Sequence, residues 1–303
     1  MNASAHEIHF ELPSLTIAAK QWGSPEGLPV LALHGWLDNA NSFDRMAPFL
    51  TGVNLVALDL AGHGRSGHRP PGGSYYLWDH VADLAEVVRQ LGWRRFALMG
   101  HSMGAGIATW YAGAFPKQVE KLFLIDGFGA PFSVETDRYP QHLGQAIRRM
   151  QMTAKAPIQR FAEQGQAQFP SFEAAVAERR KGKFGHLSHE AASLLLRRSL
   201  EQVEGGYQWR NDPRLILPAF VEPSEDIIAA FIKRIQAPAF LLLGEQGLFG
   251  QGEKAHRLAH FHNLEVQRMP GSHHLHLESA AETAALHFQR FIAASLQPIT
   301  PSP

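Results

Sequence analysis

The segment FALMGHSMGAG, residues 96–106, places one serine between two glycines directly after an apolar run. Gly100 lies two positions before Ser102, and Gly104 lies two positions after it. A nucleophilic serine needs an exposed hydroxyl, a neighbouring base and donors for the oxyanion that its attack creates. A sharp strand-to-helix turn exposes such a hydroxyl, and small residues at these two positions relieve the crowding of the turn. The spacing therefore indicates a nucleophile, the alternative being a serine that only occupies a turn.

The segments around this serine predict the elements that such a turn needs. Short apolar runs, each ending in Gly, Asp or His, recur along the chain: PVLALHG, NLVALDL, RFALMGH, KLFLIDG and AFLLLGE. Runs of this kind are typical of parallel strands buried on both faces, whereas EIHFEL and LTIAAKQWG alternate like an antiparallel pair. Helical patterns lie between the runs, as in residues 77–91, which Gly92 ends. This alternation predicts an α/β protein with a doubly wound sheet whose site lies at the carboxyl ends of the strands.

Residues 130–235 interrupt the pattern, because they contain helical stretches and loops but no convincing strand. Residues 171–184, 189–203 and 225–235 are expected to be helical. We therefore predict a core of residues 1–129 and 236–297, a helical cap of residues 130–235 and a flexible tail of residues 298–303. The cap is expected to lie over the strand ends as a lid, the alternative being extra helices packed away from the site.

Composition sets limits on function. The 303 residues are 45% hydrophobic and 18% charged, which is typical of a globular protein. Lys and Arg number 28, as do Asp and Glu, so no net charge attracts the chain to nucleic acid or anionic membrane. The absence of cysteine excludes disulfides, thiolate metal sites and a cysteine nucleophile. With neither a secretory signal nor an apolar run of about 20 residues, we predict a cytoplasmic protein without a membrane span.

Several motifs together resemble the α/β-hydrolase superfamily. Gly100-His101-Ser102-Met103-Gly104 resembles its nucleophile elbow, and LHGW at residues 33–36 resembles the His-Gly motif after the third strand. DLAGHGRS at residues 59–66 resembles the turn after the fourth strand, and GSHHLHLE at residues 271–278 resembles the C-terminal histidine loop. The segment GGYQWRNDPRL in the cap resembles the serine-hydrolase-like or esterase subgroup. The resemblance implies a mostly parallel sheet with helices on both faces and a cap inserted after the sixth strand.

The resemblance also implies an oxyanion hole. Its donors would be the backbone N–H groups of Met103 and Trp36, and losing one such donor typically costs about 3 kcal/mol of transition-state stabilisation. His34 is expected to hold the loop by hydrogen bonds and to border the substrate. Asp59 is expected to stabilise the turn that follows it.

Three histidines in the C-terminal loop are candidates for the base. The family spacing maps onto His273, His276 and Glu278, with His273 as the catalytic base and adjacent His274 as the alternative. His273, His276 and Glu278 could instead hold a metal ion, but the H-E-x-x-H spacing typical of such sites is absent. We therefore expect neither a metal nor a cofactor.

The acid is where the sequence departs from the family pattern. Many relatives carry it after the seventh strand as G-x-x-D, but here that place reads Gly244-Glu245-Gln246-Gly247. Two carboxylates remain as candidates. Asp126, at the end of the sixth predicted strand, is favoured, and Glu245 is the alternative. The acid must accept a hydrogen bond from His273, and a Ser–His dyad without an acid stays a third possibility.

We therefore expect a serine hydrolase that acts on carboxylic esters of short or medium acyl chain and needs no cofactor. Phe128, Phe132 and Trp209 are expected to contact the acyl group. The RRKGK segment at residues 179–183 is expected to be a solvated helix end, the alternative being an attraction for anionic substrates. A serine at the elbow argues against haloalkane dehalogenases and epoxide hydrolases. Carbon–carbon bond hydrolysis, hydroxynitrile lysis and ligand binding without turnover remain alternatives on the same scaffold. The sequence does not indicate the oligomeric state.

Overall fold

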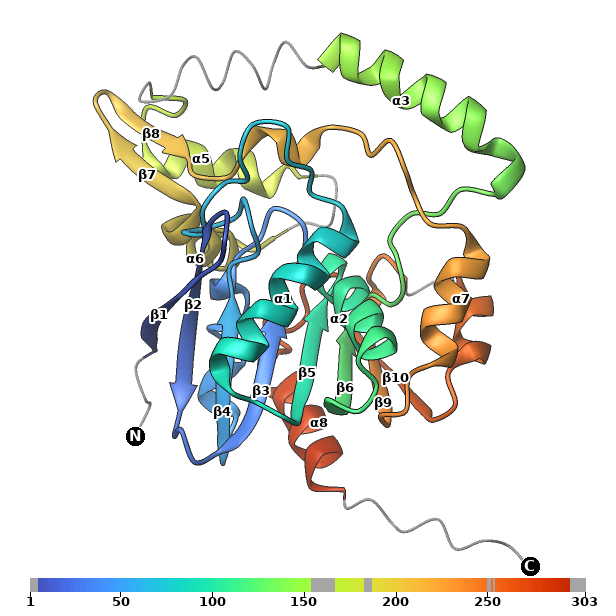
Figure 1. The fold of residues 1–303 in the computed structure, drawn as a ribbon. Coiled ribbons are helices and arrows are strands. Elements are labelled where there is room, and N and C mark those ends of the chain that lie inside the picture. Colours follow the sequence, from blue (N-terminus) through green and yellow to red (C-terminus); the bar gives the residue numbers. More distant parts are fainter. Residues whose placement is uncertain (1–4, 154–166, 183–186, 250–251, 253, 295–303) are drawn as a thin grey trace, which may run out of the picture.

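The computed structural model describes residues 5–153, 167–182, 187–249, 252 and 254–294 (Figure 1). In this part of the chain one eight-stranded sheet has the order β1-β2-β4-β3-β5-β6-β9-β10. The strands are β1 His6–Glu11, β2 Thr16–Gly23, β3 Leu28–Leu33, β4 Val53–Leu58, β5 Phe96–His101, β6 Val119–Ile125, β9 Ala239–Gln246 and β10 Leu264–Ser272. β1 pairs antiparallel with β2 and β2 with β4, and all later neighbours are parallel. The expected α/β sheet with an N-terminal antiparallel pair is confirmed.

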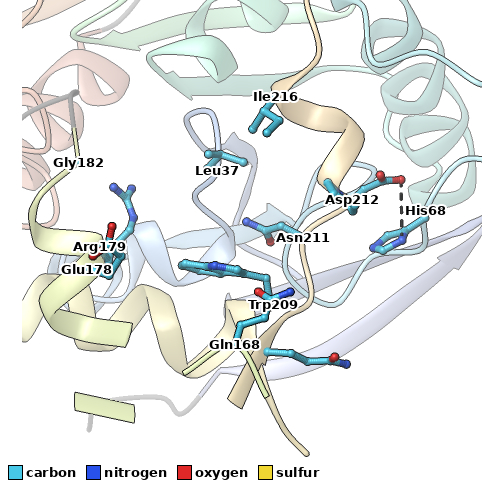
Figure 2. Close-up of a pocket in the computed structure, with 12 residues that line it drawn as sticks. Leu37, His68, Gln168, Glu178, Arg179, Gly182, Trp209, Asn211, Asp212 and Ile216 are labelled. Atoms are coloured by element: carbon cyan, nitrogen blue, oxygen red, sulfur yellow. Dashed lines mark ion pairs between the residues drawn. The ribbon is translucent and has the colours of Figure 1, made fainter. Parts of the chain in front are cut away.

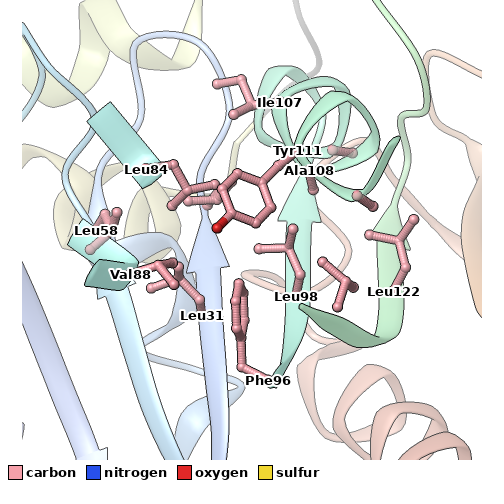
Figure 3. Close-up of a cluster of buried hydrophobic side chains, with 14 of the residues drawn as sticks. Leu31, Leu58, Leu84, Val88, Phe96, Leu98, Ile107, Ala108, Tyr111 and Leu122 are labelled. Atoms are coloured by element: carbon pink, nitrogen blue, oxygen red, sulfur yellow. The ribbon is translucent and has the colours of Figure 1, made fainter. Parts of the chain in front are cut away.

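Helices cover both faces of the sheet because alternate side chains of each buried strand point to opposite faces. On one face, Leu31 and Leu98 pack in a cluster with Leu84 and Val88 of α1, Leu77–Leu91, and Tyr111 of α2, Met103–Ala114 (Figure 3). On the other face, the apolar side chains pack against Phe43 and against α8, Ala281–Ala293. α7, Glu225–Lys233, packs beside α2. The two-faced burial explains why these strands are continuous apolar runs.

Most of the insertion between β6 and β9 lies over the carboxyl ends of the parallel strands, whereas its last helix, α7, lies beside α2 (Figure 1). Its described elements are α3 Tyr139–Thr153, α5 Phe172–Arg180, α6 His189–Ser199, β7 Leu200–Val203, β8 Gly206–Trp209 and α7 Glu225–Lys233. Short 3₁₀ turns occur in the insertion at Thr136–Arg138 and Pro213–Ile216. In the core they occur at Ala40–Phe43, Ala47–Phe49 and Ala255–His260. α5 and α6 share a small core with Leu277 of the histidine loop, so this part of the insertion packs on the site rather than away from it.

Two sequence predictions about strands are wrong. The insertion is not free of strands, because β7 and β8 form an antiparallel hairpin where we expected the end of a helix and an irregular connector. Glu204 and Gly205 connect the two strands, and the Gly205-Gly206 pair at this turn is a hairpin signal that the prediction missed. β10 was also missed, because its half-exposed LEVQRM pattern lacks the apolar continuity of the central strands. The predicted flexible tail, residues 298–303, lies outside the described residues.

Three buried imidazoles pack against one another beside the sheet, between the ends of β3 and β4 and helix α1. The ring centroids of His34 and His63 lie 5.0 Å apart, and those of His63 and His80 lie 6.4 Å apart. Burial lowers the pKa of His34 to about 4 and that of His63 to about 3, and it also lowers the pKa of His80. All three are therefore neutral at pH 7 and resist protonation in the folded state.

We predict that this cluster makes the fold sensitive to mild acid. Below about pH 6.5 the unfolded chain binds protons at these histidines and the folded chain does not, so stability falls as the pH falls. Below about pH 6.5, each of these imidazoles lowers the free energy of unfolding by up to about 1.4 kcal/mol for each pH unit of acidification. Urea unfolding of the wild type and His80→Leu at about pH 7 and about pH 5 measures the effect, and the variant should lose less free energy on acidification. His189→Gln, which removes an exposed histidine, is the control. Equal losses in wild type and His80→Leu would contradict the assignment.

Candidate active site

Ser102 occupies a strained turn between β5 and α2. Its backbone has φ 51° and ψ −116°, a conformation that costs energy in a residue other than glycine. The turn is held because the Ser102 N–H donates to the Ile125 carbonyl at 3.0 Å. A Cβ at Gly100 would lie 2.4 Å from the Gly104 carbonyl oxygen, and one at Gly104 would lie 2.2 Å from that of Leu33. Only glycine fits at these two positions, which is the physical basis of the motif around Ser102.

The structure brings Ser102, His273 and Asp126 together in one line of hydrogen bonds. The Nε2 atom of His273 lies 2.9 Å from the Ser102 Oγ, and its Nδ1 lies 2.5 Å from the Asp126 Oδ2. Because a carboxylate only accepts, Nδ1 carries the proton and Nε2 is left to accept from the serine hydroxyl. Burial lowers the pKa of His273, and the hydrogen bond to Asp126 opposes that effect. The imidazole is thus neutral and oriented for proton transfer from Ser102.

Asp126 is fully buried and its carboxylate is satisfied on every side. Its Oδ1 accepts from the Gly244 N–H at 3.2 Å, and its Oδ2 accepts from the Leu248 N–H at 2.9 Å as well as from His273. The backbone of Asp126 has φ 39°, a left-handed conformation that Asp tolerates better than most residues. These contacts join Asp126 to two other segments, residues 244–248 and the histidine loop, so the site depends on tertiary structure.

Gly247 explains the departure from the family pattern. A Cβ built on this glycine would lie 2.3–2.6 Å from the carboxylate atoms of Asp126. The Asp126 carboxylate therefore occupies the space into which a side chain at position 247 would point. The alternative acid, Glu245, lies on the exposed end of β9. His273 Nδ1 forms its hydrogen bond with Asp126 instead.

The two expected oxyanion donors lie on segments that touch. Met103 is the first residue of α2, where backbone N–H groups have no acceptor within the helix. The end of β3 passes against this helix start, since a Cβ at Gly104 would lie 2.6 Å from the His34 carbonyl oxygen. Trp36 follows at once, and its indole N–H donates to the Leu215 carbonyl of the insertion at 3.0 Å.

His34 is a buried residue at the end of β3, and its expected contact with substrate stays a prediction. It is fully buried, with Nδ1 donating to the Gly35 carbonyl at 2.7 Å and Nε2 accepting from the Leu60 N–H at 2.9 Å. It therefore supports the loop that carries Trp36, as expected from the sequence.

The other members of the histidine loop have separate partners. Nε2 of His276 lies 2.9 Å from the Ser42 Oγ, and Glu278 accepts from the Ser188 N–H at the start of α6 at 2.8 Å. Nε2 of His274 lies 3.1 Å from the Asp38 Oδ2. His273, His276 and Glu278 thus do not converge on a point, so the metal site considered for them is not formed.

A cavity of about 240 Å³ lies between the insertion and the oxyanion loop (Figure 2). Leu37, which follows Trp36, lines it on the core side, and Trp209, Arg179 and Ile216 line it on the insertion side. Phe128 and Phe132 are not among its lining residues: Phe128 is buried against Phe249, and Phe132 is 62% exposed. Of the three aromatic residues expected to contact substrate, Trp209 is the one at the cavity.

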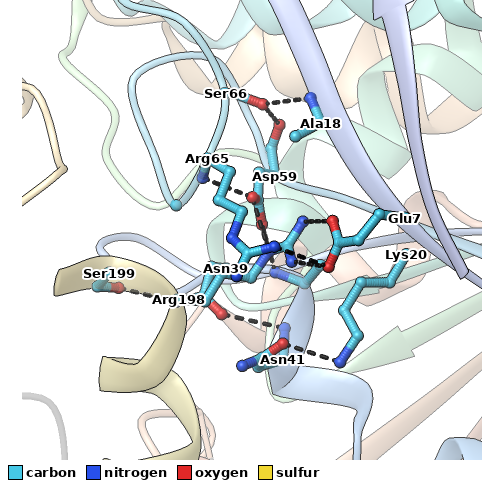
Figure 4. A network of polar contacts seen from close by, with 12 residues as sticks. Glu7, Ala18, Lys20, Asn39, Asn41, Asp59, Arg65, Ser66, Arg198 and Ser199 are labelled. Atoms are coloured by element: carbon cyan, nitrogen blue, oxygen red, sulfur yellow. Dashed lines mark hydrogen bonds and ion pairs between the residues drawn. The ribbon is translucent and has the colours of Figure 1, made fainter. Parts of the chain in front are cut away.

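A buried guanidinium fastens the insertion to the core. Nε of Arg198 on α6 donates to both oxygens of Asp59, at 2.8 and 2.7 Å (Figure 4). Its Nη1 and Nη2 donate to Glu7 on β1 at 2.6 and 3.0 Å. Asp59 also accepts from the Ala40 and Arg65 N–H groups, which is the turn-stabilising role expected of it. The sequence analysis missed Arg198, because no local pattern links it to partners more than a hundred residues away.

The RRKGK segment is not simply a solvated helix end, which corrects that expectation. The Arg179 side chain is 15% exposed, and its Nη2 donates to the buried Asp38 Oδ1 at 2.7 Å. Arg180 is exposed, as expected. Lys183 lies outside the described residues.

This fold and this site define an α/β hydrolase. The family model for the alpha/beta hydrolase fold matches residues 29–280, and the chain belongs to this family. The chain is 34% identical over 302 residues to serine hydrolase-like protein 2 of Homo sapiens, covering 92% of each protein. A solved hypothetical protein from Pseudomonas aeruginosa PAO1 is 43% identical, with TM-score 0.84 over 95% of this chain and 98% of that one. The thioesterase domain from the curacin biosynthetic pathway is 27% identical, with TM-score 0.76 over 94% of this chain and 99% of that one.

These similarities support a hydrolase of the serine-hydrolase-like subgroup. Among the described residues, no helix combines the length and the apolar character that crossing a membrane requires. The cytoplasmic location stays a prediction, as do the boundaries of the cap.

We predict that Arg198→Met lowers the free energy of unfolding by about 3–5 kcal/mol, because it leaves Asp59 buried without its cation. Urea unfolding measures the loss. Arg197→Met removes an exposed arginine from the same helix and is the matched control. A loss in Arg198→Met no larger than that in the control would show that the buried ion pair does not hold the insertion.

Proposed function

We propose that the protein is a serine hydrolase that cleaves carboxylic esters through Ser102, His273 and Asp126. The observation that carries this proposal is the pair of hydrogen bonds from Ser102 Oγ to His273 and from His273 to Asp126. Nucleophile, base and orienting acid in this order are the arrangement that activates a serine hydroxyl at neutral pH.

In the first half of the reaction, His273 Nε2 takes the proton of Ser102 as Oγ attacks the acyl carbon. The carbonyl oxygen becomes an oxyanion that the N–H groups of Met103 and Trp36 stabilise. Asp126 stabilises the imidazolium through Nδ1–H and stays ionised. The bond to the leaving alcohol then breaks, the alcohol takes the proton from Nε2, and an acyl-Ser102 ester remains.

In the second half, water replaces the alcohol. His273 takes a proton from the water as its oxygen attacks the acyl carbon, and the same two N–H groups stabilise the oxyanion. The bond to Ser102 Oγ breaks, Oγ recovers the proton from Nε2, and the carboxylic acid leaves. These steps need no cofactor.

The cavity supports a small substrate. The volume of about 240 Å³ bordered by Leu37, Trp209 and Ile216 suits a short or medium acyl chain. Neither Ser102 nor His273 is among its lining residues, so its link to the site is Leu37, which follows Trp36. A thioester is a second candidate, because the chain is 27% identical to a thioesterase domain over 94% of its length. Both substrates pass through the same acyl-serine, and only the leaving group differs.

We predict that Ser102→Ala abolishes both turnover and covalent labelling. Its kcat on p-nitrophenyl esters should fall by about 10⁶-fold, because no nucleophile remains. Fluorophosphonate labelling of the folded protein should also disappear. Ser14→Ala, which removes an exposed serine of the β1–β2 loop, should leave both unchanged. Wild type that hydrolyses neither esters nor thioesters and resists labelling would favour a ligand-binding relative without turnover.

We predict that Asp126→Asn lowers kcat by about 10⁴-fold, since the histidine loses the carboxylate that sets its tautomer. Glu245→Gln is the matched control, because it removes the alternative carboxylate and should change kcat little. Steady-state kinetics on the best ester of the series measures both.

Moving the acid extends this test. Asp126→Gly vacates the space toward which position 247 points, so adding Gly247→Asp should restore at least about tenfold of the lost kcat. The double variant showing no gain over Asp126→Gly, with both folded, would contradict our explanation of Gly247.

A further inference from the structure

Three potential metal ligands lie together next to His273. They are Asp38 Oδ2, His101 Nδ1 and His274 Nε2, which all lie within 4.8 Å of one another. The residues are 1%, 0% and 4% exposed. We propose that these three side chains bind one divalent transition-metal ion, with Zn²⁺ as the best-fitting ion. The proposal rests on this geometry alone and is independent of the proposed hydrolase activity.

The tautomer of His101 points to a cation at this place. Its Nε2 lies 2.9 Å from the His273 carbonyl oxygen, which can only accept, so Nε2 carries the ring proton. In the neutral ring Nδ1 then carries a lone pair and no proton. This nitrogen lies 3.6 Å from the Asp38 Oδ2. Nδ1 is buried and has no hydrogen-bond partner in the part of the chain that the structure describes. Two facing acceptors repel unless a positive charge lies between them, and a metal ion supplies that charge.

Two of the three distances between ligand atoms are close to those of tetrahedral zinc, and the third, between His101 Nδ1 and His274 Nε2, is within 4.8 Å. Zn–N and Zn–O bonds near 2.0–2.1 Å place neighbouring ligand atoms about 3.4 Å apart. The Asp38 Oδ2 lies 3.1 Å from His274 Nε2 and 3.6 Å from His101 Nδ1, on either side of that value. Two imidazoles with one carboxylate form a donor set that zinc uses, with a water as the fourth ligand. Hydrogen bonding of a ligand imidazole through its other nitrogen to a backbone carbonyl, as in His101, is also typical of metal sites.

The surroundings leave room and orient the carboxylate. A Cβ at Gly35 would lie 2.9 Å from both Asp38 Oδ2 and His101 Nδ1, so the glycine leaves that side of both atoms open. Arg179 binds the other carboxylate oxygen, Oδ1, and holds Oδ2 toward the imidazoles. Its positive charge opposes a metal, so we expect micromolar rather than tighter affinity. On metal binding, the proton that His274 Nε2 shares with Asp38 leaves or moves to Nδ1.

The position of the site indicates a structural role. Asp38 belongs to the oxyanion loop, His101 directly precedes Ser102, and His274 directly follows His273. One bound ion would therefore hold together the three loops that form the active site without touching the reacting atoms. We expect bound Zn²⁺ to raise the melting temperature by several degrees, because a ligand that binds only the folded state stabilises it.

Metal binding by the tag-free full chain tests the proposal. After chelator treatment and dialysis against Zn²⁺, elemental analysis should find about one zinc per chain, and Mg²⁺ should not bind. Co²⁺ should give the intense visible bands of four-coordinate nitrogen and oxygen ligation. Uptake below about one tenth of a zinc per chain would overturn the proposal. So would ¹⁵N spectra of wild type in Zn²⁺ that show a doubly protonated His101, because a proton would then supply the charge.

Variants assign the site. His274→Asn should weaken zinc binding at least about tenfold, and Asp38→Asn should do the same. His256→Asn is the matched control, because it removes an exposed imidazole that, like His274, contacts a carboxylate. Its Nε2 lies 2.9 Å from the Glu225 Oε2. Equal zinc uptake by folded His274→Asn and wild type would place the metal elsewhere and overturn the proposal. If neither ligand variant folds, the Co²⁺ spectrum of the wild type decides, and six-coordinate bands would exclude this site.

Discussion

The buried carboxylate of Asp126 is the constraint on which the rest of the site depends. A carboxylate without solvent must be fully hydrogen-bonded, and this one accepts from His273 and from the backbone of Gly244 and Leu248. Those contacts bring the end of β6, the loop after β9 and the histidine loop to one point. They also require glycine at position 247, where any side chain would collide with the carboxylate. The Asp126 carboxylate therefore determines both the orientation of the His273 ring and the residue at position 247.

Charge burial recurs where the insertion meets the core. Arg198 lies between Asp59 and Glu7, and Arg179 reaches Asp38, so two arginines of the insertion end on carboxylates of the core. Buried pairs of this kind add less stability than their Coulomb energy suggests, but breaking one leaves a costly lone charge. They thus restrict how the insertion can sit over the strand ends, and with it the shape of the cavity that Trp209 and Leu37 border.

Histidine is used here mainly as a buried, directional group. His34 supports the oxyanion loop, and His273 lies between serine and carboxylate. His101 and His274 meet at Asp38 next to it. A ring with two distinct nitrogens can join two backbone or side-chain partners in a defined direction, which explains its frequency around this site. The same property makes the pair at Asp38 suited to hold a metal.

What the sequence determined by itself is local. The glycines around Ser102, the apolar strand runs and the order of the motifs are enough to predict the α/β sheet, the nucleophile and the base, because steric limits and periodicity act over a few residues. Only the tertiary structure placed Asp126 rather than Glu245 beside His273, and paired Arg198 with Asp59 and Arg179 with Asp38. Those outcomes depend on which side chains meet across a hundred or more residues, and on whether a buried charge finds its partner there. The spacing of residues along the chain predicts neither these long-range contacts nor the partners of buried charges.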